Sequence, residues 1–233
     1  MSGKALIGSI VWGYPGRMVA YAVLTLIVGQ WIYGQMQVDD PTAVGRENGP
    51  IEMMQVVAAI AAMVAFFVAA YRSHYGKAGL VLCGAMAGYA AGRECDSWFE
   101  AALFDDAYKY VVGLPMLAIA VAAGWKYRKT VLIDTLRLSR TPAITMFGIA
   151  GVYICVVCQI FDRPGFWVAI ADHPAVMPTR ALVEEFAEVF GYLMIAIAGG
   201  EAIIETFPEA SAGETSVLQM DRSSEPVSHQ RAA

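Results

Sequence analysis

The stretch IEMMQVVAAIAAMVAFFVAAY at residues 51–71 decides the fold class of this chain, because it is apolar almost throughout and its one charge, Glu52, lies at its start. One helical crossing of a hydrocarbon core about 30 Å thick takes about 20 such residues. In the whole chain 58% of residues are hydrophobic and 16% are charged, against about 45–50% and about 25% in soluble domains. The sequence therefore predicts an all-α membrane protein in contact with a lipid bilayer.

Other apolar stretches of similar length flank residues 51–71 on both sides. They predict one polytopic transmembrane helical domain, residues 1–207, with about six transmembrane helices. The predicted spans are residues 18–34, 51–71, 78–99, 109–125, 143–162 and 181–206. After Pro208 large apolar residues almost disappear, so we predict that residues 208–233 form a disordered cytoplasmic tail.

The loops differ in charge in a way that predicts the orientation. The loop after the fourth span has five basic residues against the single acid Asp134. The loops that follow the first and third spans lean acidic, with Asp39, Asp40 and Glu47 in the first of them. Because short cytoplasmic loops are enriched in lysine and arginine, both chain termini are predicted to be cytoplasmic.

This topology brings carboxylates from several spans to the outer membrane face. Glu94 lies about sixteen residues into the third span, about 24 Å from the cytoplasmic side. Charges at membrane depth cost at least about 2.5–3.5 kcal/mol each at the centre, so they are expected to pair or to face the bundle interior. The candidate ligand- or ion-binding residues are Glu52, Glu94, Asp96, Glu185 and Glu188, with Arg93 and Arg163 as counter-ions.

These candidates differ in how strongly they suggest a function. Glu52 and Glu185 open predicted helices, where the helix dipole alone favours a negative charge. Glu94 and Asp96 interrupt an apolar stretch that resumes with Trp98 and Phe99. They are therefore the stronger functional candidates.

Three chemistries suit such a cluster: binding of a divalent cation by carboxylates, acid–base work or proton relay by close carboxyls, and binding of an anionic headgroup by arginine. The leading hypothesis is an outward-facing pocket that binds a cation or a polar lipid or solute, for transport or sensing. The alternatives are a non-catalytic subunit of a membrane complex or a homo-oligomer, and a metal-dependent enzyme acting on lipid. A net charge of −5 argues against nucleic acid as a partner.

Three short motifs carry a resemblance to known proteins: ENGPIE at residues 47–52, RECD at 93–96, and the pair Glu184–Glu185 that opens the last span. In these motifs the chain resembles a loose group of uncharacterised bacterial multi-pass membrane proteins. The resemblance implies a location in the bacterial inner membrane and no known activity.

Overall fold

The computed structural model of this chain describes residues 13–38, 49–170 and 176–206. All regular secondary structure in these ranges is helical, which confirms the all-α prediction for the described part. The predicted tail, residues 208–233, lies outside it. The α-helices are α2 (Tyr14–Val38), α4 (Pro50–Arg72), α5 (Lys77–Glu94), α6 (Asp96–Ala102), α7 (Leu114–Lys126), α8 (Val131–Leu138), α9 (Pro142–Val152), α10 (Gln159–Phe161), α11 (Pro164–Ile170) and α12 (Val176–Glu205), and the π-helical turns are η1 (Lys109–Gly113) and η2 (Tyr153–Cys158).

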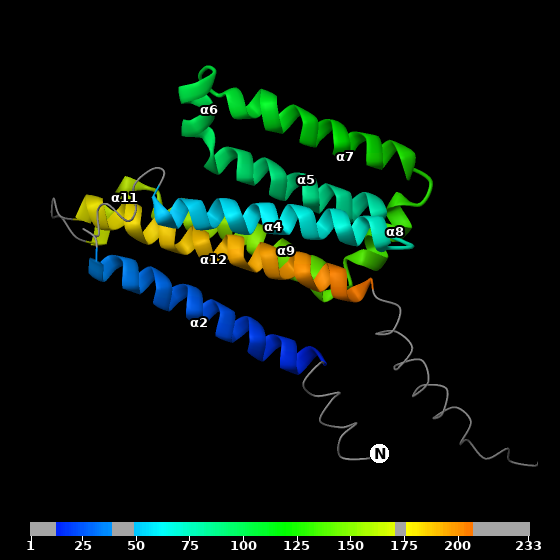
Figure 1. Cartoon of the computed structure of the whole chain (residues 1–233), viewed down its shortest axis with the longest axis horizontal. Coiled ribbons are helices and arrows are strands. Elements are labelled where there is room, and N and C mark those ends of the chain that lie inside the picture. Colours follow the sequence, from blue (N-terminus) through cyan, green and yellow to red (C-terminus); the bar gives the residue numbers. More distant parts are fainter. Residues whose placement is uncertain (1–12, 39–48, 171–175, 207–233) are drawn as a thin grey trace, which may run out of the picture.

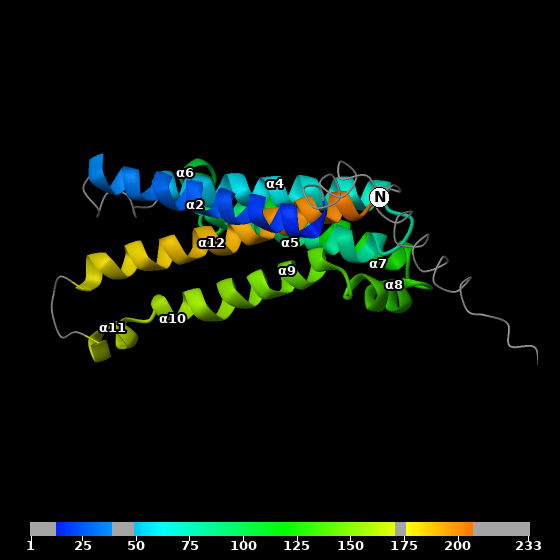
Figure 2. The same cartoon turned by 90° about the horizontal axis from the view of Figure 1, so that it is seen from below.

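Helix α4 lies between α5 and α12 at the centre of the bundle (Figure 1). It begins with Pro50, whose fixed φ suits a first helical position. Its small side chains Ala59, Ala62 and Ala69, spaced three to seven apart, share one face with Phe66, and all four are fully buried. The long helices run side by side, and η2 and α10 continue the line of α9 (Figure 2).

Four helical segments of the described part are long and apolar enough to cross a membrane: Tyr14–Gln37, Pro50–Arg72, Pro142–Phe161 and Arg180–Glu205. A fifth is obtained if Lys109–Lys126 and Val131–Leu138, which are bent by 111° relative to one another, count as one span. Helix α5 is not among them, since its 18 residues include Lys77, Arg93 and Glu94. The described residues thus hold four to five candidate spans, where the sequence predicts six.

The predicted span at residues 78–99 is divided in the structure. Helix α5 ends at Glu94, and α6 begins at Asp96 after a turn at Cys95 (φ −101°, ψ 15°). The carboxylate of Asp96 accepts the backbone N–H of Ser97 at 2.5 Å, and such side-chain bonds to the backbone compete with a continuing helix. The polar run 93–96 therefore ends α5 instead of continuing it.

Close contact between α12 and α4 depends on Gly199. A Cβ atom at this position would lie 2.9 Å from Ala65 Cβ and 3.2 Å from the carbonyl oxygen of Ala62. We expect Gly199→Leu to destabilise the bundle by about 1–3 kcal/mol, the usual cost of overpacking. The measurement is the thermal unfolding midpoint in mild detergent.

The adjacent Gly200 provides the matched control for this variant, because a Cβ there would have no neighbour within 4 Å. Gly200→Leu is expected to unfold near the wild-type midpoint. Equal losses of stability in the two variants would show that the helix contact at Gly199 does not cause the destabilisation.

Candidate functional site

Three helices bring polar side chains together at the end of the bundle where α5 meets α6. The amide of Gln55, on α4, donates to Glu185 Oε2 at 2.7 Å and to the carbonyl oxygen of Glu185 at 3.3 Å. The hydroxyl of Tyr192, on α12, donates to Glu94 Oε1 at 2.7 Å. The structure therefore places Glu94 and Glu185, two sequence candidates from different helices, in two hydrogen-bonded pairs at this end of the bundle, Tyr192–Glu94 and Gln55–Glu185.

Arg93 lies between the carboxylates of Glu94 and Glu188 but is bound closely to neither. Its Nε is 3.7 Å from Glu94 Oε1, and its Nη2 is 3.8 Å from Glu188 Oε1. Both distances exceed hydrogen-bond length. The Arg93 side chain is 45% exposed, whereas that of Glu188 is 5% exposed. The guanidinium thus supplies positive charge to buried carboxylates while its N–H donors stay available.

The remaining sequence candidates make no hydrogen bond to these two pairs that the described part shows. Glu52 is half-buried in the first turn of α4, where its charge acts on that of Glu185, and Asp96 bonds to the backbone at the start of α6. Arg163 is exposed and, within the described ranges, takes part in no ion pair. The partner of Asp162 is instead Arg180.

The carboxylates do not form a metal centre in the part of the chain that the structure describes. No group of three or more His, Cys, Asp or Glu side chains is placed there to hold a metal ion. Two acceptor atoms, Gln55 Oε1 and Glu188 Oε1, are buried with no hydrogen-bond partner among the described residues.

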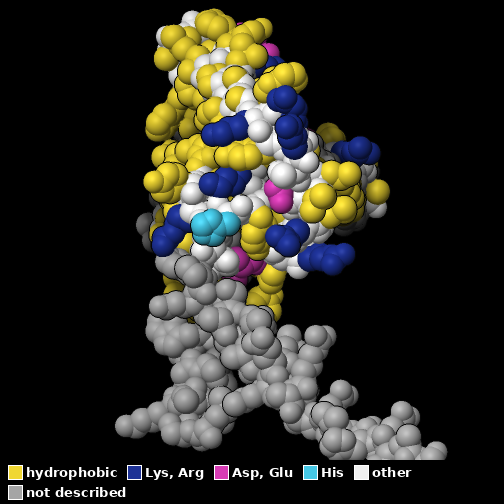
Figure 3. Space-filling model, turned by 90° about the vertical axis from the view of Figure 1, so that its right-hand side faces the viewer, with side chains coloured by type: hydrophobic (Ala, Val, Ile, Leu, Met, Phe, Trp, Pro, Cys, Tyr) yellow, Lys and Arg dark blue, Asp and Glu magenta, His cyan; other side chains and the backbone are white. Residues whose placement is uncertain are grey.

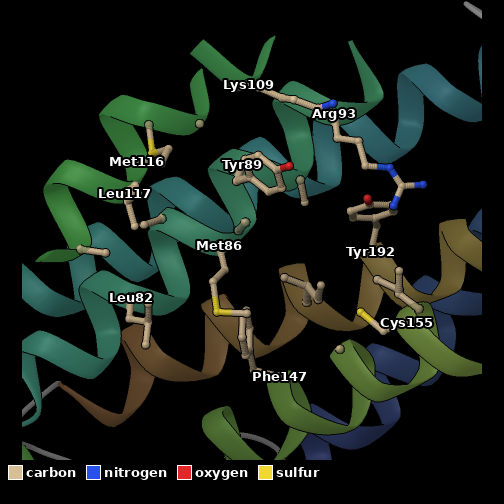
Figure 4. A pocket seen from close by; sticks show the side chains of 18 of the residues that line it. Leu82, Met86, Tyr89, Arg93, Lys109, Met116, Leu117, Phe147, Cys155 and Tyr192 are labelled. Atoms are coloured by element: carbon tan, nitrogen blue, oxygen red, sulfur yellow. The ribbon is translucent and has the colours of Figure 1, made fainter. Parts of the chain in front are cut away.

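An apolar groove with a volume of about 640 Å³ begins beside these two hydrogen-bonded pairs. Its walls come from α5, α7, α9 and α12, and the π-helical turns η1 and η2 also contribute to it. Arg93 and Lys109 lie near one another at one end, and Leu82, Met86 and Phe147 line its length away from them (Figure 4). Turns of this π-helical kind occur frequently at functional sites. The groove therefore has a basic end and an apolar body.

Sequence reasoning did not identify this groove. Its body is lined by Ala, Gly, Leu and Met residues, the types that equally face lipid or fill a helix interface. The Tyr192–Glu94 hydrogen bond joins α12 to α5 at one end of the groove, and α7 and α9 line its two sides. No local pattern in the sequence marks that arrangement.

A second polar cluster, also missed from the sequence, joins α2 to α12. Glu201 is fully buried and accepts from Arg17 Nε at 2.7 Å and Nη2 at 3.2 Å, and from the hydroxyl of Tyr21. Arg17 and Tyr21 are four residues apart and therefore share a face of α2. The available signal was Glu201 itself, an acid inside an apolar span.

The two clusters and the groove are the features from which function can be argued, because a helical bundle by itself implies none. The groove is the only one of the three that has both room for a ligand and charged groups at its edge. Comparison of the chain with protein-family models, with curated proteins and with solved structures finds no match.

Proposed function

We propose that this chain is a six-span protein of the bacterial inner membrane that binds an anionic amphiphile in the groove between α5, α7, α9 and α12. The acidic headgroup of the ligand lies at Arg93, and its apolar part lies along the groove. The observation that carries this proposal is the separation of charge within the groove, with Arg93 and Lys109 at one end and apolar side chains along the rest (Figure 4).

The size and lining of the groove support a ligand of lipid-like shape. Small-molecule sites are mostly apolar clefts of about 300–1,000 Å³ with few polar groups, and this groove measures about 640 Å³. Methionines at 86 and 116 give it adaptable walls. A long apolar chain fits such a surface better than a compact polar solute does.

The charges at the basic end support an acidic headgroup. A guanidinium binds carboxylate or phosphate oxygens through two parallel N–H bonds, and no described acceptor lies within hydrogen-bond distance of the Arg93 side chain. Lys109 supplies a second positive charge, but its Nζ is paired with Asp106 Oδ1 at 2.6 Å. Arg93 is therefore the principal headgroup residue.

The six-span topology counts α5 and the η1–α7 segment as separate crossings. Lys109–Lys126 has 18 residues and is about 27 Å long, close to the thickness of a hydrocarbon core of about 30 Å. The charges of α5 lie at its ends, at Lys77 and Arg93–Glu94, where they reach the interface. Both termini are then cytoplasmic, and the basic end of the groove faces outward.

Gly151 provides a direct test of the groove, because it lines the groove and a Cβ there would have no neighbour within 4 Å. We expect Gly151→Phe to fill the groove and to lower the affinity for a spin-labelled fatty acid at least about tenfold, a loss of about 1.4 kcal/mol. The measurement is the immobilised fraction of the probe, by electron paramagnetic resonance, with the protein in neutral phosphatidylcholine nanodiscs.

The matched control is Gly148→Phe. Gly148 lies one turn earlier on α9, also has open space at its Cβ position, and is not part of the groove lining. Its variant should bind the probe as the wild type does. If Gly151→Phe binds the fatty acid as tightly as Gly148→Phe does, the groove is not the binding site.

A further inference from the structure

Helix α8 lies across the end of the bundle opposite α6 (Figure 1). Its axis makes an angle of 111° with the Lys109–Lys126 segment that precedes it. If that segment crosses the membrane, α8 lies nearly parallel to the membrane surface. This geometry is typical of an interfacial helix.

One side of α8 exposes large apolar residues to the surroundings. Leu132, Ile133 and Leu136 have exposed fractions of 72%, 70% and 59%, and their spacing places them on one face. Leu138, in contrast, is buried, and its methyl groups lie 2.7–3.4 Å from the positions that Cβ atoms would take at Gly76 and Gly79. The helix is thus fixed to the start of α5 while its apolar face remains uncovered by the described part of the chain.

Basic side chains surround this apolar face at the same end of the molecule (Figure 3). Between residues 126 and 140 the only acid is Asp134, and the bases are Lys126, Arg128, Lys129, Arg137 and Arg140. Two of the bases are positioned by aromatic rings: the Arg128 guanidinium lies 4.8 Å from the Trp125 ring centre, and that of Arg137 lies 5.2 Å from the Tyr75 ring centre. Trp125 itself is 71% exposed, as is usual for tryptophan at a membrane interface.

We propose that α8 lies in the headgroup layer of the cytoplasmic leaflet and recruits anionic phospholipids. Leucine and isoleucine on one face of a surface helix enter the acyl boundary, and flanking lysine and arginine attract acidic headgroups. The membrane's own lipids are favoured over a protein partner because α8 carries apolar and basic groups together and lies nearly perpendicular to a spanning segment. This surface is at the opposite end of the bundle from Arg93, so it is independent of the groove.

The first test measures lipid selectivity in nanodiscs of phosphatidylcholine that contain a small fraction of spin-labelled phosphatidylglycerol. We expect the Arg128→Gln/Lys129→Gln/Arg140→Gln variant to lose association with the anionic probe by about fivefold for each charge removed. Spin-labelled phosphatidylcholine should be unaffected. The control is Arg163→Gln, which removes an exposed charge just before α11, at the end of the bundle opposite α8. Unchanged phosphatidylglycerol association in the triple variant would overturn the proposal.

The second test measures depth and does not depend on the charges. With the native cysteines replaced by alanine, spin labels are placed at Ile133→Cys and Lys129→Cys. We expect the label at position 133 to be accessible to oxygen, which concentrates in lipid. The label at position 129 should instead be accessible to a water-soluble nickel chelate. Water accessibility at both positions would place the α8 face in solvent or against a soluble partner and would contradict the proposal. Both tests are independent of the groove: if Gly151→Phe loses binding of the fatty acid, lipid selectivity and label depth at α8 are expected to stay as in the wild type.

Discussion

Arg17→Leu is expected to destabilise the protein by about 3 kcal/mol, because it leaves the fully buried Glu201 carboxylate without its counter-charge. This value is at the lower end of the range of about 3–5 kcal/mol for breaking buried pairs, since the Arg17 side chain keeps 24% of its surface exposed. The Tyr21 hydroxyl still donates to Glu201 in the variant, but a neutral donor cannot replace a positive charge. The measurement is the free energy of unfolding in mild detergent with increasing denaturant.

Two further variants separate loss of the pair from general damage to α2. Arg17→Leu combined with Glu201→Leu removes both charges and should recover most of the lost stability, because an apolar pair of similar volume is often as stable as a buried ion pair. Arg180→Leu breaks the Arg180–Asp162 pair, whose carboxylate side chain is 44% exposed, and should cost only about 0–1 kcal/mol. A double variant no more stable than Arg17→Leu would refute the prediction that the unpaired Glu201 charge causes the loss of stability.

The helical class and the long apolar segments were predictable, because run length and hydropathy depend only on local sequence. The pair Arg17–Glu201 was not predictable from the sequence. Its two residues are 184 positions apart in the chain, and α2 meets α12 by tertiary packing that no periodicity encodes. Arg17 alone had the appearance of an ordinary cytoplasmic charge at the start of a span.

The acidic end of the bundle was predictable in part. Topology brings Glu94, Glu185 and Glu188 to the same end of the bundle, because α5 runs antiparallel to α12 and its last turn lies beside the first half of α12. The rotation of each helix about its own axis decides the contacts, so Tyr192 as the partner of Glu94 and Gln55 as the partner of Glu185 could not be read from spacing. The break at Cys95 likewise depends on a local competition between backbone and side-chain hydrogen bonds, which hydropathy does not register.

Arg93→Gln is expected to weaken binding of a spin-labelled fatty acid about tenfold to a hundredfold, because hydrogen bonds to a charged group contribute about 1.5–3 kcal/mol. Binding of the corresponding spin-labelled fatty alcohol, which has the same chain and no charge, should change little. Lys109→Gln should have a smaller effect, since Lys109 is already paired with Asp106. Because Arg93 also supplies positive charge to the buried carboxylates Glu94 and Glu188, some loss of stability is expected, and a cooperative thermal unfolding transition in mild detergent would show that the variant is folded. An equal loss for acid and alcohol would indicate a structural role for Arg93, and no loss for the acid would place the headgroup elsewhere in the groove.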